Sequence, residues 1–90
     1  MHTVRDKKKL IARVRRIRGQ LDAVERALES EVGCAAVLQT VTAARGALNG
    51  LVSELIEGHI RSHVVDPEQI DAHQREAVEE LVQVVRAYVK

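Results

Sequence analysis

The sequence contains few of the residues on which disulfide-bonded, membrane-spanning and β-rich proteins depend. Tyr88 is the only aromatic residue and Pro67 the only proline, which excludes most β-rich folds and the aromatic platforms that bind single-stranded nucleic acid. Cys34 is the only cysteine, so no intrachain disulfide can form. No apolar run approaches the roughly 20 residues of a membrane-spanning helix, and the polar start MHTVRDKKK lacks the apolar stretch of a secretion signal. We therefore expect an all-helical protein in the cytoplasm.

The length and composition indicate one small domain. The chain has 90 residues, and we expect a single domain over residues 1–90. Hydrophobic residues make up 46% and charged residues 30% of the sequence, which excludes a disordered chain and a membrane protein. Because so short a chain without disulfides or large aromatic side chains builds only a thin core, we expect it to bury further apolar surface by self-association.

Charge is distributed unevenly along the chain. The first 28 residues hold nine lysines and arginines against three acidic residues, whereas the remainder is acidic and the net charge is only +1. Seven cations with no acidic residue among them occupy one short segment: Lys7, Lys8, Lys9, Arg13, Arg15, Arg16 and Arg18. Lys9, Arg13 and Arg16 share one helical stripe, which can follow a DNA phosphate backbone. The alternative is a solvated helix face balanced by Asp22 and Glu25.

The spacing of apolar residues predicts three helices. Apolar residues step by 4, 3, 4, 3 and 4 in two stretches, which predicts helices over roughly 5–29 and 34–63. The short polar segment 30–33 contains a glycine that can stop a helix, so the two helices should form a hairpin. Asp66 as N-cap, Pro67 at the first helical position and a glutamine two residues later predict the start of a third helix.

The single cysteine and two of the histidines share one face of the second predicted helix. At about 100° per residue, His59 and His63 each lie roughly 20° from Cys34. At about 1.5 Å per residue, however, Cys34 and His59 are roughly 38 Å apart, so one chain cannot use both at one site. An antiparallel second copy that crosses near residue 47 or 48 brings Cys34 of one chain to the histidines of the other, twice per dimer. Small residues around this crossing allow close approach of the two backbones.

These side chains can form a metal site between chains. A histidine pair at i and i+4 can bind one ion, and a thiolate at a helix N-terminus is a good further ligand. His2 near the N-terminus can add an imidazole and the amino group of the chain. Such mixed nitrogen and sulfur ligands suit Co(II), Ni(II) or Zn(II) better than Cu(I).

Other interpretations of the same residues remain open. Cys34 can be a small buried hydrophobe, and the His59 and His63 pair can be an exposed or core feature without a metal. The protein would then be a helical interaction module, and with a metal site but no DNA contact it would be a metal-storage bundle. An enzyme is not indicated, because the sequence has no Ser/His/Asp arrangement, phosphate loop or paired acids.

Three sequence features together resemble a known family. They are the string RVRRIRGQLDAVERALE, the segment ARGALNGL after the cysteine that opens the second helix, and the pair His59-x-x-x-His63. Over essentially its whole length the chain resembles the CsoR/RcnR/FrmR family of small bacterial repressors. The resemblance implies three helices per chain, an antiparallel dimer forming a four-helix bundle, and a homotetramer built as a dimer of dimers. It also implies a repressor without a helix-turn-helix that leaves operator DNA when an inducer binds.

Within this family the chain is most similar to the nickel and cobalt branch. The resemblance implies metal binding by His2, Cys34, His59 and His63, with the α-amino group of Met1 as a further ligand. Copper members carry a second cysteine in place of His63, which argues against copper. The resemblance also implies that Arg13 and Arg16 are the main DNA contacts, flanked by the lysines. The alternative inducer is formaldehyde acting on Cys34, although the formaldehyde branch uses an N-terminal proline where this chain has histidine.

Overall fold

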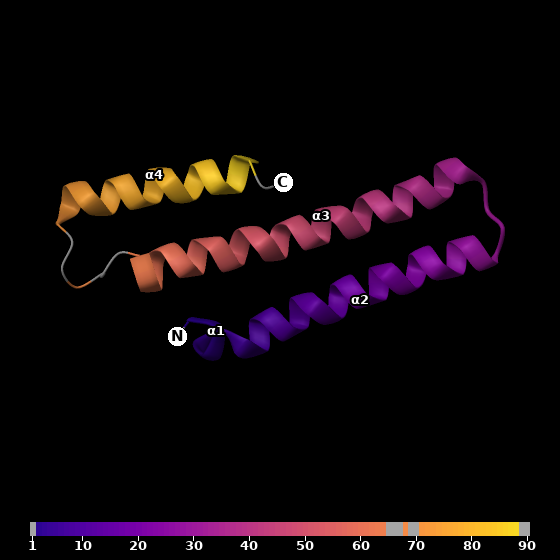
Figure 1. The fold of residues 1–90 in the computed structure, drawn as a ribbon, viewed down its shortest axis with the longest axis horizontal. Coiled ribbons are helices and arrows are strands. Elements are labelled where there is room, and N and C mark those ends of the chain that lie inside the picture. The colour runs from indigo at the N-terminus through magenta and orange to yellow at the C-terminus, as the bar shows by residue number, and fades with distance from the viewer. Residues whose placement is uncertain (1, 65–67, 69–70, 89–90) are drawn as a thin grey trace.

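The computed structural model describes residues 2–64, 68 and 71–88. The described helices follow one another as α1 (His2–Arg5), α2 (Lys7–Glu29), α3 (Cys34–His59), the π-helix η1 (Ile60–Val64) and α4 (Ala72–Tyr88) (Figure 1). No strand occurs among these residues, and the prediction of an all-helical chain with three long helices is confirmed. None of the described helices combines the length and the apolarity that crossing a bilayer requires.

The hairpin between α2 and α3 forms as predicted, but its left-handed residue is not the glycine. Glu31 has a φ of 55°. Its N–H donates to the carbonyl of Leu28, and the N–H of Val32 donates to the carbonyl of Ala27, which is the paired arrangement that commonly ends an α-helix. Gly33 instead has an extended backbone and precedes the first turn of α3 as its N-cap. The predicted glycine stop is therefore wrong, and Glu31 takes this role.

The second long helix changes its winding near its end. The sequence predicted one helix over 34–63, whereas the α-helix ends at His59 and a π-helix continues over Ile60–Val64. A π-turn closes its hydrogen bonds from i to i+5 and is wider than an α-turn, and such turns occur frequently at functional sites. The backbone of His63 lies in this wider segment.

Helix α4 begins later than predicted. Asp71 and Gln74 form a reciprocal cap, in which the N–H of Gln74 donates to Asp71 Oδ1 at 2.8 Å and the N–H of Asp71 donates to Gln74 Oε1 at 3.0 Å. This arrangement satisfies two N–H groups at a helix start, and the helix begins at Ala72 rather than at Pro67. The predicted capping residues Asp66, Pro67 and Gln69 themselves lie outside the described residues.

The three long helices form one flat layer. Helix α3 lies in the middle, with α2 along one side and α4 along the other (Figure 1). The extents are 56 × 25 × 12 Å, and the smallest is close to the roughly 10–12 Å diameter of a single helix. The radius of gyration is 17.2 Å, against about 12 Å for a compact domain of this length. Each helix therefore has its two broad faces uncovered within one chain.

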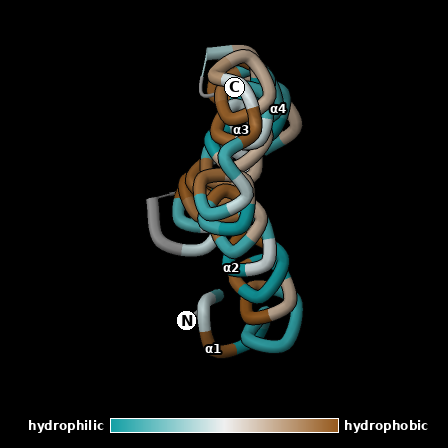
Figure 2. Tube along the Cα trace, turned by 90° about the vertical axis from the view of Figure 1, so that its right-hand side faces the viewer, coloured by the Kyte–Doolittle hydropathy of each residue, from teal (hydrophilic) through white to brown (hydrophobic). Residues whose placement is uncertain are grey.

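The core of the single chain is correspondingly small. The buried hydrophobic side chains among the described residues are Ile17, Ala44, Ile60 and Val82. Helix α3 is the most hydrophobic of the three long helices (Figure 2), yet many of its large apolar side chains are exposed. Stable domains bury such faces against a second layer of structure. The described residues of a single copy do not supply that layer.

Candidate metal centre and nucleic-acid interface

The N-terminal histidine packs against the end of α3. The side chain of His2 is buried, with 7% of its surface exposed, and its ring lies directly against the backbone of Gly58. The neighbouring ring of His59 is 6.5 Å away between centroids and meets it edge-on, at 62° between the planes. His2, at the start of α1, and His59, at the end of α3, are far apart in the sequence, and their imidazole rings lie together at the open end of the helical hairpin.

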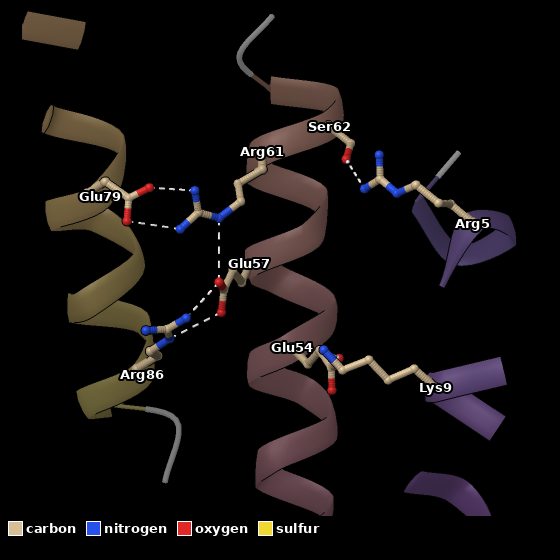
Figure 3. Close-up of polar contacts among 8 residues, drawn as sticks. All are labelled: Arg5, Lys9, Glu54, Glu57, Arg61, Ser62, Glu79 and Arg86. Carbon is tan, nitrogen blue, oxygen red and sulfur yellow. Dashed lines mark hydrogen bonds and ion pairs between the residues drawn. The ribbon is translucent and has the colours of Figure 1, made fainter. Parts of the chain in front are cut away.

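A short segment joins this histidine pair to the basic helix. Only Asp6 separates α1 from α2, and its N–H donates to the carbonyl of His2 at 2.8 Å while its own carbonyl accepts from Leu10 at 3.0 Å. Arg5 Nη2 donates to Ser62 Oγ in η1 at 3.3 Å (Figure 3). The segment from His2 to the start of α2 is therefore held against the end of α3 and η1.

The two rings suit a transition metal, but one chain does not complete the predicted site. Bonds from imidazole nitrogen to such metals are about 2.1 Å, so two rings that bind one ion must come closer together than the 6.5 Å that separates these two ring centroids. Cys34 is exposed at the far end of α3, about 38 Å from His59 along a continuous helix. His63 lies in η1, and its side chain is outside what the structure describes. Among the described residues, no three His, Cys, Asp or Glu side chains of one chain come together.

An apolar stripe connects the two ends of this face on α3. At about 100° per residue, five large hydrophobic side chains fall within about 40° of Cys34, and His59 falls about 20° from it. These five are all exposed in the single chain: Leu38, Val41, Leu48, Val52 and Ile56. The face therefore has a thiol at one end, an imidazole at the other and uncovered apolar surface between them.

The seven cations predicted to contact DNA all lie on α2. Glu54 of α3 forms ion pairs with two of them, Lys9 at 3.0 Å and Arg13 (Figure 3 for Lys9). Within the part of the chain that the structure describes, the other five make no ion pair, and all five are exposed: Lys7, Lys8, Arg15, Arg16 and Arg18. No ion pair joins these cations to Asp22 or Glu25, the balancing charges considered from the sequence. Glu54 is a functional candidate that the sequence analysis missed.

Four charged residues fix α4 to the same end of α3. Arg61 donates to Glu79 from Nη1 at 2.5 Å and from Nη2 at 3.0 Å, and Arg86 donates to Glu57 from Nη2 at 2.7 Å and from Nε at 3.2 Å (Figure 3). Arg61 Nε also lies 3.4 Å from Glu57. The hydrogen bonds from Arg61 lower the pKa of Glu79, and the same bonds raise the pKa of Arg61. This charge chain ties α4 to the segment that carries His59 and His63.

Comparisons with known proteins show a family match over most of the chain. The sequence profile of the family described as metal-sensitive transcriptional repressors matches residues 6–87. The chain is 51% identical over 89 residues to a protein in the bioA 5′ region of Serratia marcescens, and 43% identical over 89 residues to the transcriptional repressor RcnR of Salmonella paratyphi B; each match covers 99% of this chain and 98% of the relative.

A solved structure has the same chain fold. It is a variant of the formaldehyde-responsive regulator FrmR from Salmonella enterica serovar Typhimurium in which one glutamate is replaced by histidine, with 47% sequence identity and a TM-score of 0.67. The match covers 98% of this chain and 99% of that one. The chain therefore belongs to the family of metal-sensitive transcriptional repressors, whose members are repressors and not enzymes.

Proposed function

We propose that the chain represses transcription by binding double-stranded operator DNA in its metal-free form and leaves the DNA when Co(II) or Ni(II) binds, with Zn(II) as a third candidate. The observation that carries this proposal is the contact between the rings of His2 and His59. It supports the proposal because two imidazoles, which are common metal ligands, meet at the start of the segment that leads, seven residues later, to Lys9 and the basic helix α2.

The complete metal site forms between two copies of the chain. An antiparallel crossing of two α3 helices near residue 47 places Cys34 opposite the partner's His59. The same register sets Leu38 opposite the partner's Ile56 and Val41 opposite the partner's Val52, so the exposed apolar stripe covers itself. The helical hairpins of two chains then supply each other's missing layer as a four-helix bundle, and two such dimers form the homotetramer.

The proposed ligands are His2, Cys34, His59 and His63, with the α-amino group of Met1 as an addition. This set is rich in nitrogen and has one thiolate, and imidazole-rich sites suit Co(II), Ni(II) and Zn(II), whereas Cu(I) favours soft sulfur ligands. The exposed thiol of Cys34 stands at the N-terminal end of α3, where a second chain can reach it.

DNA binding is assigned to the basic face of α2. Arg13 and Arg16 contact operator phosphates, with Lys7, Lys8, Lys9, Arg15 and Arg18 adding positive charge around them. Contacts of this kind position the protein, and sequence preference then comes partly from the shape of the DNA. The N-terminal segment links this face to the metal site, because His2 is held by the metal in one state and the cations that follow are held by phosphate in the other.

The metal and the operator therefore favour different arrangements of the N-terminal segment. A bound metal would be held by His2 and His59, and it would stabilise the arrangement in which this segment packs against the end of α3 and η1, so that the orientation of α2 and its charges would follow. Derepression requires the metal to favour the low-affinity state by about 1–3 kcal/mol or more, and operator DNA must weaken metal binding by the same factor.

The test is operator binding by the purified metal-free protein, titrated separately with Co(II), Ni(II), Zn(II), Cu(I) and formaldehyde while the absorption spectrum is recorded. We expect release by Co(II) or Ni(II), with a thiolate charge-transfer band that is absent in Cys34→Ala. The double variant Arg13→Ala/Arg16→Ala should bind metal normally and DNA poorly. Normal DNA binding by that variant would contradict the assignment of the basic face, and a protein that binds metal but never DNA would instead be a metal-binding bundle.

Formaldehyde is the second candidate inducer. It is favoured by the exposed thiol of Cys34 and by the 47% identity to a formaldehyde-responsive regulator. Release of DNA by formaldehyde alone would support this candidate and contradict the metal response, because the histidines would then have no part in sensing.

A further inference from the structure

Gly58 differs from the other glycines of the chain in what occupies the space beside it. A Cβ atom built on Gly58 would lie 2.9 Å from His2 Nε2 and 3.1 Å from His2 Cγ, and closer still to His2 Cδ2. Carbon atoms in folded proteins do not approach imidazole rings this closely. The same atom built on Gly19, Gly33 or Gly46 meets nothing within 4 Å, and on Gly50 it meets only the flexible end of Arg13.

Neither the helical position of Gly58 nor its backbone angle explains why this residue is a glycine. It is the penultimate residue of α3, one residue before His59, and the chain continues as a helix in η1, so glycine is a poor helix former there and alanine would stabilise the helix. No left-handed backbone angle requires glycine there, since the glycines of the structure have no positive φ. The ring of His2 fills the space that a side chain would occupy, and this packing sets its edge-on contact with His59.

From this geometry we propose that Gly58 is the positioning residue that admits the imidazole of His2 to the metal site, and that it thereby determines how many nitrogen ligands the site offers. The inference rests on the proposed metal response. With any side chain at position 58, Cys34, His59 and His63 remain, but His2 is displaced. Zn(II) binds in tetrahedral sites with few ligands, so its affinity should fall less than that of Co(II) or Ni(II).

The packing is tested first in the metal-free protein, where no metal chemistry is involved. In the wild type we expect a nuclear Overhauser effect between the ring protons of His2 and the α protons of Gly58. In Gly58→Ala the His2 ring should become exposed, and its resonances should move to those of a flexible N-terminus. Gly19→Ala is the matched control, because it makes the same chemical change in a helix with nothing nearby, and it should leave the His2 resonances unchanged. Absence of the effect in the wild type would overturn the inference.

The role in metal binding is tested by a double-mutant cycle of Gly58→Ala and His2→Ala. We expect Gly58→Ala to weaken Co(II) and Ni(II) binding by about 10–100-fold, the range seen when the support of a metal ligand is removed. In the His2→Ala background the same substitution should change the metal affinity less than about twofold, because the imidazole ring that the new methyl group would displace is already absent.

The outcomes separate this inference from the proposed function. Tight metal binding by the wild type and equally tight binding by Gly58→Ala would overturn the role of Gly58 and leave the metal response intact. An equal loss of metal affinity on Gly58→Ala in the wild-type and His2→Ala backgrounds would also overturn it, because Gly58 would then act on the helix and not on His2. If the wild type bound none of these metals, both proposals would fail.

Discussion

The carboxylate of Glu54 lies 3.0 Å from the ammonium group of Lys9 and joins the middle helix of the layer to the basic helix. The same carboxylate pairs with Arg13, so one acidic residue holds two of the seven cations assigned to DNA. If Lys9 and Arg13 bind operator phosphates as proposed, phosphate and Glu54 compete for these two side chains. Part of the proposed DNA-binding charge is then already paired with Glu54 in the single chain.

Replacing Glu54 by glutamine should therefore strengthen operator binding. Removal of the negative charge frees Lys9 and Arg13 for phosphate, and we expect the affinity to rise by about three- to tenfold at low salt, which corresponds to about 1 kcal/mol for ion pairs that are only partly shielded from water. The measurement is a DNA-binding titration at several salt concentrations. Glu57→Gln is the matched control, since Glu57 lies one turn further along α3 and pairs with Arg86 rather than with α2. Weaker DNA binding by Glu54→Gln would show that Glu54 positions the two cations for DNA.

A mixture of two inactive variants should regain metal binding if the site lies between subunits. Cys34→Ala and His59→Ala each remove one ligand from every site, so neither alone should bind Co(II) with the wild-type spectrum. After unfolding and refolding together, mixed dimers contain one intact site, in which Cys34 and His59 come from different chains. About a quarter of the wild-type sites should then return.

The thiolate charge-transfer band of Co(II) measures this recovery. The matched control is a mixture of Cys34→Ala with the double variant Cys34→Ala/His59→Ala, which contains no cysteine at position 34 and should recover nothing. Failure of the first mixture to recover, in dimers shown to have exchanged, would contradict a site shared between two chains.

The attachment of α4 should weaken in acid through Glu79. The hydrogen bonds from Arg61 lower the pKa of this carboxyl below its ordinary value of 4.5. A carboxyl with a lowered folded-state pKa stabilises the fold above its unfolded-state pKa, and this contribution is lost as the pH falls through the folded-state value. We expect Glu79→Gln to reduce amide protection in α4 at pH 7 and to reduce it less at pH 3.

Hydrogen exchange of the α4 amides at the two pH values provides the measurement. Glu80→Gln changes the neighbouring carboxyl, which makes no ion pair within the described chain, and should have no effect at either pH. A loss of protection in Glu79→Gln that is equally large at pH 3 would exclude an ionic role for Glu79.

Glycine at position 31 should stabilise the protein. Glu31 has a φ of 55°, and a residue with a side chain in this left-handed region costs roughly 1–2 kcal/mol. Glu31→Gly removes that cost, but it also raises the conformational entropy of the unfolded chain, which opposes folding. We therefore expect a net stabilisation of about 0.5–1 kcal/mol. Thermal unfolding at one fixed protein concentration measures it, because association shifts the midpoint. Ser30→Gly, at a φ of −81°, is the control and should not stabilise.

Much of this arrangement could be predicted from local sequence patterns. The apolar periodicity predicted α2, α3 and their hairpin, because each pattern persists over many turns and a short polar segment separates them. Asp66 and Pro67 are strong helix-start residues and predict that α4 begins at Pro67. The reciprocal cap of Asp71 and Gln74 sets the start at Ala72 instead, and these two residues have the spacing of a capping box in the sequence as well.

The contacts across the layer were harder to predict. Residues equally far from the turn face each other in a helical hairpin, so the position of the turn at 30–33 is enough to predict the pairing of Lys9 with Glu54. The contact of His2 with Gly58 cannot be predicted in this way, because it depends on how α1 folds back and on the space beside Gly58 in the packed structure. The change to a π-helix at Ile60 likewise has no signature in the apolar periodicity.

The short connection between α1 and α2 has a mechanical consequence. Lys9 follows His2 by only seven positions, or about 10 Å of helix, with Asp6 as the single residue outside the two helices. Inducer and operator are thus not at the two ends of a long relay through the protein. If metal binds at His2 and operator at Lys9 as proposed, both ligands act on one short segment, and the coupling free energy between them depends on how rigidly that segment holds His2 relative to Lys9.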